Sequence, residues 1–284
     1  MANQQTKGVN VPVALAFVGI MFFSIGFALG INSFLIPVLP TSFSIQSWES
    51  YLILTATFLP FIIFGYPASR TIAAIGYKRT MAFSFLLFAL GFGMYIVSAH
   101  YESFAFFIVA SFISGTGNTF LQASVNPYTT ILGPIESAAK RISIMGICNK
   151  LAWPIAPVFL AWVIGKDVSS VVLGDLYTPF YIIIAVFLVL GVLALLAPLP
   201  EVKAVGEDAD SVDDCPYAAN KTSIWQFPHL WLGALTLFLY VGVETVALST
   251  LVDYAASLGL PTAASYGWVA SIGMVVGYVC GISM

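Results

Sequence analysis

The chain has 284 residues, of which 60% are hydrophobic and only 8% are charged, and its mean hydropathy is +0.96. A soluble domain carries about 25% charged residues, so this composition excludes a water-soluble globular protein. The net charge of −3 argues against nucleic acid as a partner. The apolar residues fall in blocks of about twenty or more, the length that a helix needs to cross a bilayer. We therefore predict an all-α membrane protein.

The apolar blocks predict eight membrane helices in chain order. They are expected at Val11–Leu39, Trp48–Ile75, Thr80–Ser98, Ser103–Leu132, Ile142–Gly165, Thr178–Ala197, Phe227–Tyr254 and Ala263–Met284. Pro127, Pro154 and Pro157 are expected kink points, because each proline removes one helical hydrogen bond. The first block is interpreted as a helix and not as a cleaved signal peptide, because it has no small-residue cleavage site.

The basic residues predict the orientation of these helices. Eight of the ten lysines and arginines lie at the N-terminus or in connections that fall on the same side: Lys7, Arg70, Lys78, Arg79, Lys140, Arg141, Lys203 and Lys221. The opposite side offers only Lys166, and Lys150 lies within a helix. Cytoplasmic loops carry the excess of Lys and Arg. We therefore predict a multi-pass membrane protein with its N-terminus in the cytoplasm.

A long polar stretch divides the chain into three parts. Residues 1–197 form a predicted N-terminal six-helix half, residues 198–226 an acidic cytoplasmic linker, and residues 227–284 the start of a C-terminal half. Aligning Gly26 with Gly242 also matches Ser33 to Ser249, so the seventh helix is interpreted as a weak repeat of the first. Because the second half has only two helices, we expect the chain to be truncated.

Three carboxamides mark one face of the fourth helix. Asn118, Gln122 and Asn126 recur every four residues, which places them on the same side. Carboxamides both donate and accept hydrogen bonds, as sugar hydroxyls require. The alternative is that they link neighbouring helices.

The fifth helix carries a second polar group, Asn149, Lys150 and Trp153. Lys150 lies nine residues beyond Arg141, which corresponds to about 13 Å into the membrane. We expect Lys150 to pair with an acid or to face a watery cavity. Asn149 and Trp153 share a face, where an amide beside an indole can bind a sugar, although ordinary packing is the alternative for Trp153.

Glu244 is the one acid placed well inside a predicted membrane helix. Acids in this environment are candidates for proton or cation transfer. The alternative is a structural pair with Lys150, and the same pair would also serve as a coupling device. On the first helix, Asn32 and Ser33 follow the small residues Gly26 and Gly30.

The sequence offers no pattern of an enzyme or a metal site. Cys148, Cys215 and Cys280 are scattered without CxxC spacing, and His100 and His229 lie at helix ends. No HExxH, GxSxG or phosphate-loop motif is found. We expect no catalytic activity, no cofactor and no bound metal.

Several stretches of the chain resemble one known family. They are Gly26–Asn32, Leu35–Pro37, Gly76–Arg79, Leu121–Tyr128, Leu132–Pro134 and Tyr240–Glu244. These stretches resemble the fucose–proton symporter family of the major facilitator superfamily, especially its glucose/galactose transporter branch. The Asn126-Pro-Tyr and Leu132-Gly-Pro pairing is the most specific part. The resemblance extends over nearly the whole chain, which corresponds to roughly the first two thirds of a full-length member.

The resemblance implies a twelve-helix fold of two halves, of which this chain contains about eight helices, with a sugar site between the halves. The family pattern has an acid after its helix 1 asparagine and a glutamate before the helix 4 Asn-Pro. This chain has Ser33 and Gln122 at those positions. Proton coupling is therefore not expected there, whereas sugar binding by Gln122 and Asn149 is.

With this resemblance, we predict a monomeric secondary active transporter in the lipid bilayer of the bacterial cytoplasmic (inner) membrane. It moves a hexose by alternating access, with glucose or galactose favoured over fucose. Asn32, Gln122, Asn126, Asn149 and Trp153 are the predicted substrate-binding residues. Glu244 and Lys150 are the candidates for coupling to H⁺ or Na⁺. The alternatives are an uncoupled sugar facilitator, a membrane sugar sensor that does not transport, and an inactive fragment.

Overall fold

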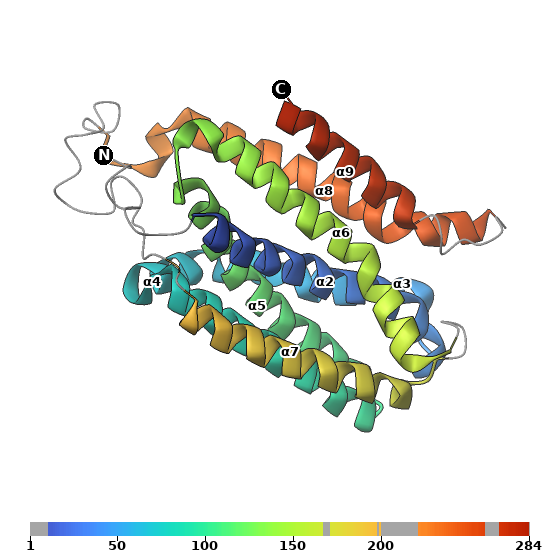
Figure 1. Ribbon diagram of the computed structural model, residues 1–284. Helices are drawn as coiled ribbons and strands as arrows, with labels where there is room; N and C mark the ends of the chain where they lie inside the picture. Colours follow the sequence, from blue (N-terminus) through green and yellow to red (C-terminus); the bar gives the residue numbers. More distant parts are fainter. Residues whose placement is uncertain (1–10, 167–170, 198, 200–220, 259–266, 284) are drawn as a thin grey trace. The chain divides into compact units, whose positions relative to one another are not determined.

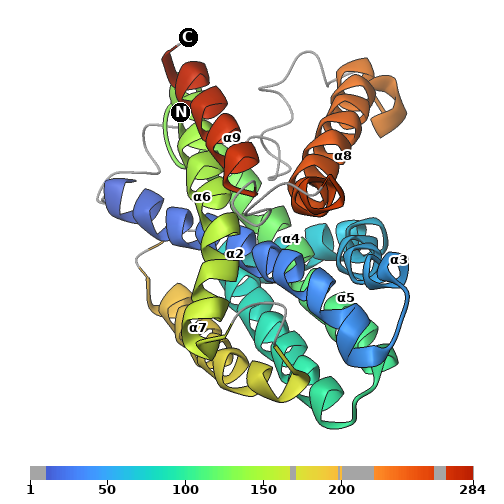
Figure 2. The same ribbon diagram turned by 90° about the vertical axis from the view of Figure 1, so that its right-hand side faces the viewer.

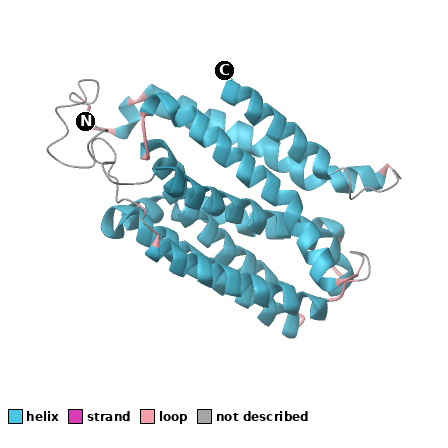
Figure 3. Cartoon of the chain, in the orientation of Figure 1, coloured by secondary structure: helices cyan, strands magenta, loops and turns pink. Residues whose placement is uncertain are grey.

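The computed structural model describes residues 11–166, 171–197, 199, 221–258 and 267–283. Helices dominate this part of the chain, and it contains no strand (Figure 3). The helices are α2 (Val11–Phe43), α3 (Ser47–Ser50), α4 (Leu52–His100), α5 (Phe104–Ile131), α6 (Ala138–Ile164), α7 (Tyr177–Leu196), α8 (Pro228–Ser257) and α9 (Gly267–Ser283) (Figure 1). Single turns of 3₁₀ helix lie at Ile135–Ser137, Leu173–Leu176 and Ile224–Gln226. The predicted all-α class is confirmed.

The observed helices follow the predicted apolar blocks closely. The largest differences at described helix ends are that α2 continues through Pro40 to Phe43 and that α6 begins at Ala138 rather than at Ile142. Residues 263–266, the start of the predicted eighth helix, lie outside the described residues. Among the residues that the structure describes, six helical stretches are long and apolar enough to cross a membrane: Val11–Pro40, Ser47–His100, Phe104–Ile131, Ala138–Ile164, Leu173–Leu196 and Pro228–Leu248. Helix α9 adds a shorter apolar segment, Trp268–Ile282.

Helix α4 contains two of the predicted helices. Its backbone breaks at Gly76, where φ is 84° and ψ is 167°, a conformation that only glycine adopts readily. The residues before and after the break pack on neighbouring positions of α5, since Thr57 lies against Gly115 and Gly91 lies against Ser114. In one straight helix Thr57 and Gly91 would be about 50 Å apart. The chain therefore turns back at Gly76, and α4 supplies two membrane spans.

The chain divides into two compact units. The first comprises Met1–Glu201 with Val275–Met284, and the second comprises Val202–Met274. Within the first unit α2 packs on α6, while α4 packs on both α5 and α7 (Figure 2). The predicted N-terminal half, residues 1–197, falls in this first unit. Most of the predicted linker, residues 198–226, lies outside the described residues, so the three-part division stays a prediction.

An aromatic cluster forms the packing surface between α4 and α7. Phe187 of α7 lies with its ring 5.0 Å from that of Phe88 and 5.5 Å from that of Phe92. Phe180, about two helical turns before Phe187 on α7, has its ring 5.5 Å from that of Tyr95. All of these rings are buried, so this part of the bundle is held by close apolar packing around the second half of α4.

Candidate functional site

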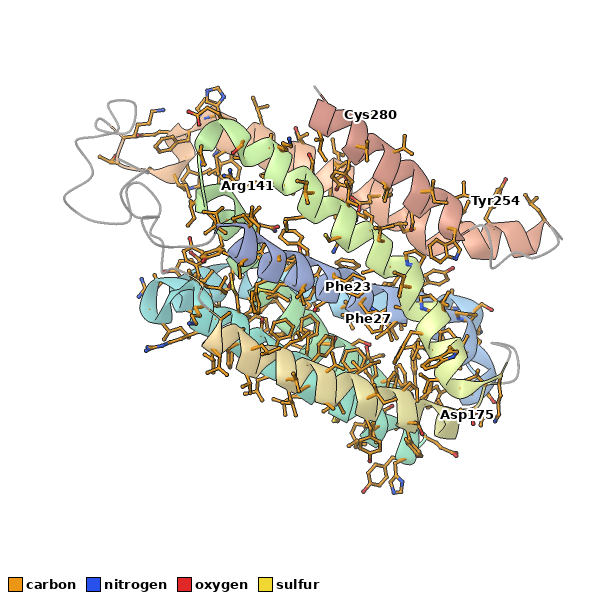
Figure 4. All side chains as sticks on the ribbon, viewed as in Figure 1. Phe23, Phe27, Arg141, Asp175, Tyr254 and Cys280 are labelled. Carbon is orange, nitrogen blue, oxygen red and sulfur yellow. The ribbon has the colours of Figure 1, made fainter. Side chains whose placement is uncertain are left out.

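The polar side chains of α6 are held in place by a very close approach of α6 to α2. A Cβ atom at Gly26 would overlap the carbonyl oxygen of Asn149, and one at Gly30 would overlap the carbonyl oxygen of Trp153. Both glycines of this Gly-xxx-Gly stretch are therefore required for backbone contact between the two helices. Phe27 of α2 adds an edge-on contact with Phe159 of α6, with ring centroids 5.5 Å apart. Figure 4 shows Phe23 and Phe27 along α2.

Two hydrogen bonds join the side chains of α6 to α2 at this contact. The Asn149 amide donates from Nδ2 to the Phe22 carbonyl oxygen at 3.1 Å. The Trp153 indole donates from Nε1 to Ser33 Oγ at 3.0 Å. The Lys150 ammonium lies 5.8 Å from the centre of the Trp153 ring, within the range of a cation–π contact. Asn149, Lys150 and Trp153 are all buried, near the middle of the 27 residues of α6.

The carboxamides of α5 form an intrahelical pair rather than a link between helices. Gln122 donates from Nε2 to Asn118 Oδ1 at 3.1 Å. Asn118 is 1% exposed, Gln122 is half-buried and Asn126 is exposed. In the described part of the chain, neither Asn118 nor Gln122 bonds to another helix. The three carboxamides therefore extend along α5 from the bundle interior at Asn118 to the surface of the first unit at Asn126.

Asn32 belongs to a different, fully buried network. Its Nδ2 donates to Thr57 Oγ1 at 3.0 Å, and its Oδ1 accepts from the Tyr95 hydroxyl at 3.5 Å. The Tyr95 hydroxyl also lies 2.9 Å from Ser111 Oγ. The network links α2, both halves of α4, and α5. Both ends of the Asn32 amide are thus occupied by the protein, as expected of a residue that joins helices.

The structure brings together some of the predicted site residues and separates others. Asn149 and Trp153 meet α2 at one interface, with Lys150 beside Trp153 on α6 and Asn32 next to Ser33 on α2. Gln122 and Asn126 follow one another along α5. Glu244 is 8% exposed and belongs to the second compact unit, so its pairing with Lys150 stays a prediction.

Two features of this region could not be predicted from the sequence. Ser33 was noted as the replacement of an acid, but its role as the hydrogen-bond partner of Trp153 depends on the crossing of α2 and α6. Arg141 is among the predicted cytoplasmic charges, and the structure shows in addition that its buried guanidinium binds three backbone carbonyls. The spacing of residues does indicate Ser33, because it lies three residues after Gly30 on the helix where Gly26 and Gly30 permit close contact with another helix.

Comparison of the sequence with known proteins assigns the chain to a family. The sequence pattern of the Major Facilitator Superfamily matches residues 18–284. The chain belongs to this superfamily. A glucose/galactose transporter of Brucella abortus is 32% identical over 249 residues, which cover 86% of this chain and 59% of that protein. The L-fucose–proton symporter of Escherichia coli K12 is 26% identical over 271 residues, which cover 88% of this chain and 61% of that protein.

Solved structures show the same superfamily fold. A crystal structure of the E. coli fucose–proton symporter matches with a TM-score of 0.73 and 22% identity, over 96% of this chain and 71% of that one. A second crystal structure of that symporter, in the outward conformation, matches with a TM-score of 0.72. The predicted family is therefore confirmed, and so is the multi-pass membrane fold. The chain spans about three fifths of the length of the curated relatives named above.

Proposed function

We propose that the protein carrying this chain transports a hexose across the cytoplasmic membrane by alternating access. Glucose or galactose is favoured over fucose, because the glucose/galactose transporter of Brucella is 32% identical while the E. coli fucose symporter is 26% identical. The two relatives named above are transporters, which favours transport over catalysis. The partners proposed are the sugar and the lipid bilayer, and the protein acts as a monomer.

The observation that carries the proposal is the buried group on α6. Trp153 is fixed by its bond to Ser33, with Asn149 and Lys150 beside it in the middle of an apolar helix. Polar and charged groups in the hydrocarbon region are costly and usually line a substrate or ion pathway. An indole offers an apolar face for the C–H side of a sugar, and carboxamides such as Gln122 match its hydroxyls.

The arrangement of charges supports a cytoplasmic N-terminus. Tyr77, beside Lys78 and Arg79, contacts Tyr128 at the end of α5 with ring centroids 5.7 Å apart. Two of the predicted basic connections therefore lie at one end of the bundle. The far end of α6 carries a single lysine, Lys166, whose Nζ donates to both carboxylate oxygens of Asp175 at 2.8 Å. This asymmetry is the one expected when the basic end faces the cytoplasm.

The proposal is tested by counterflow in liposomes. The full-length protein that carries this chain is reconstituted, and exchange of labelled glucose and galactose is measured. Counterflow that one hexose competes away supports transport and identifies the substrate class. Folded protein that shows no counterflow with any hexose refutes the sugar assignment. Stoichiometric sugar binding without counterflow would instead indicate a membrane sensor.

Replacing Gln122 with alanine should weaken sugar transport without preventing membrane insertion. The half-buried carboxamide offers both a donor and an acceptor, and alanine removes both. We expect the apparent KM for the hexose to rise roughly three- to tenfold, the value of about one hydrogen bond. Initial uptake rates at several sugar concentrations, with the amount of inserted protein measured in parallel, check this. Unchanged uptake would refute the role of Gln122.

Neutralising Glu244 by the substitution Glu244→Gln should abolish sugar accumulation while exchange persists. Ion-coupled accumulation needs a group that changes charge, and Glu244 and Lys150 are the candidates for H⁺ or Na⁺ coupling. Uptake against a gradient and counterflow at equal concentrations are compared for both proteins, with external pH and sodium varied in turn. If accumulation persists in the variant, coupling lies elsewhere. Wild-type uptake that responds to neither pH nor sodium would indicate a facilitator.

A further inference from the structure

Asn118 on α5 carries a buried polar atom that nothing in the described part of the chain satisfies. Its side-chain oxygen accepts the hydrogen bond from Gln122, but its Nδ2 has no partner and no contact with solvent. Buried amide groups are nearly always fully hydrogen-bonded. An unpaired buried donor lowers the stability of the fold, so the position needs a reason other than folding.

The orientation of the amide does not remove this deficit. If the amides of Asn118 and Gln122 are both turned over, Asn118 Nδ2 donates to Gln122 Oε1, and Asn118 Oδ1 is then the buried atom left alone. In either orientation one polar atom of Asn118 is unsatisfied within the described residues. A leucine at this position would avoid the cost and would also be a better helix former.

Asn118 fixes the orientation of the Gln122 side chain through their hydrogen bond. Gln122 follows one helical turn later and is half-buried, so part of this residue remains accessible. Its Oε1 accepts no hydrogen bond from any described residue. Without the bond to Asn118, this long side chain would lose its preferred rotamer and would have to be ordered each time a ligand binds.

We propose that Asn118 is a positioning residue, which holds the carboxamide of Gln122 ready for a substrate hydroxyl at the expense of stability. The proposal rests on the proposed function, because it takes a sugar as the ligand. It assigns Asn118 a role in affinity and none in holding the helices together. Asn32 provides the contrast, since its amide is equally buried but paired at both ends.

The same substitution at these two asparagines separates the roles. In detergent, we expect Asn118→Leu to leave the Tm of the purified protein unchanged or to raise it by about 2–4 °C. Asn32→Leu removes two hydrogen bonds between helices and should lower the Tm by about 4–8 °C. A Tm of Asn118→Leu that falls as far as that of Asn32→Leu would overturn the proposal, because Asn118 would then be structural.

Transport kinetics provide the second readout. Asn118→Leu should raise the KM for the hexose roughly three- to tenfold, with kcat changed by less than about twofold. The double variant with Gln122→Ala should show no further increase, because both substitutions remove the same interaction. Additive increases in KM would overturn the positioning role. Wild-type protein without hexose counterflow refutes the proposed function itself, and the Tm comparison then still decides whether Asn118 is structural.

Discussion

Gly26→Ala is expected to cause the largest loss of folded protein among the changes considered for this chain. The added methyl group would overlap the Asn149 carbonyl oxygen and approach Ala152 Cβ to 3.1 Å. A backbone carbonyl cannot rotate away, so α2 and α6 would have to separate. Overpacking of this kind costs about 1–3 kcal/mol or more, and separation would also break the Asn149 and Trp153 hydrogen bonds to α2.

The matched control for Gly26 is Gly65 on α4. Gly65 is exposed and has no neighbour within 4 Å of the position a Cβ would take. Alanine is the better helix former by about 1 kcal/mol, so Gly65→Ala should be neutral or stabilising. Thermal unfolding and size-exclusion profiles of both variants check the contrast. Equal profiles would show that the close contact of α2 with α6 does not support the fold.

Arg141→Ala is expected to destabilise the connection between α5 and α6 by about 2–4 kcal/mol, because hydrogen bonds from charged donors are individually strong. Arg141 is buried, and its guanidinium donates to the carbonyl oxygens of Thr129 at 3.0 Å, Pro134 at 2.9 Å and Thr130 at 2.9 Å. Thr129 and Thr130 lie in the last turn of α5, where carbonyls lack helical partners and a cation is favourable. Figure 4 marks Arg141 near the start of α6.

The substitutions Arg141→Lys and Lys140→Ala provide the controls for Arg141→Ala. Arg141→Lys should recover only part of the stability, since an ammonium group cannot reproduce the fork of the guanidinium. Lys140→Ala removes an equal charge from an exposed position of the same turn and should be nearly neutral. Thermal unfolding of the three variants tests this. If Arg141→Lys is as stable as the unsubstituted protein, charge and not hydrogen-bond geometry is what the connection needs.

The helices and their order could be predicted from the sequence because their cause is local. An apolar block of about twenty residues must satisfy its own backbone in hydrocarbon, and a helix is the solution available to one segment. Gly76 even ended a predicted helix at the correct place, although the helix resumes at once on the other side of the break. The ends of α2 and α6 were predicted less well, since Pro40 and the turn before Ala138 are accommodated by tertiary packing.

The candidate site was predictable only as a set of residue types. Spacing placed Asn118, Gln122 and Asn126 on one face, and the structure has them in that order from interior to surface. Spacing did not distinguish Asn32, which bonds to Thr57 and Tyr95, from the carboxamides that bond to no other helix. The partner of a polar side chain lies on another helix, and its identity depends on how the two helices cross.

The sequence by itself determined that this chain is a helical membrane protein, how many apolar segments it has, and which family it belongs to. These properties depend on the hydrophobicity and length of segments and on residues shared with relatives, all of which are present in the order of residues alone. Only the tertiary structure decided that Gly26 and Gly30 allow the close approach of α6, and that Ser33 binds the Trp153 indole. It alone also shows that Asn118 has a buried atom without a partner among the described residues. The bond between Trp153 and Ser33 joins residues 120 positions apart, because packing and hydrogen bonding act over a few ångströms in space regardless of separation in sequence.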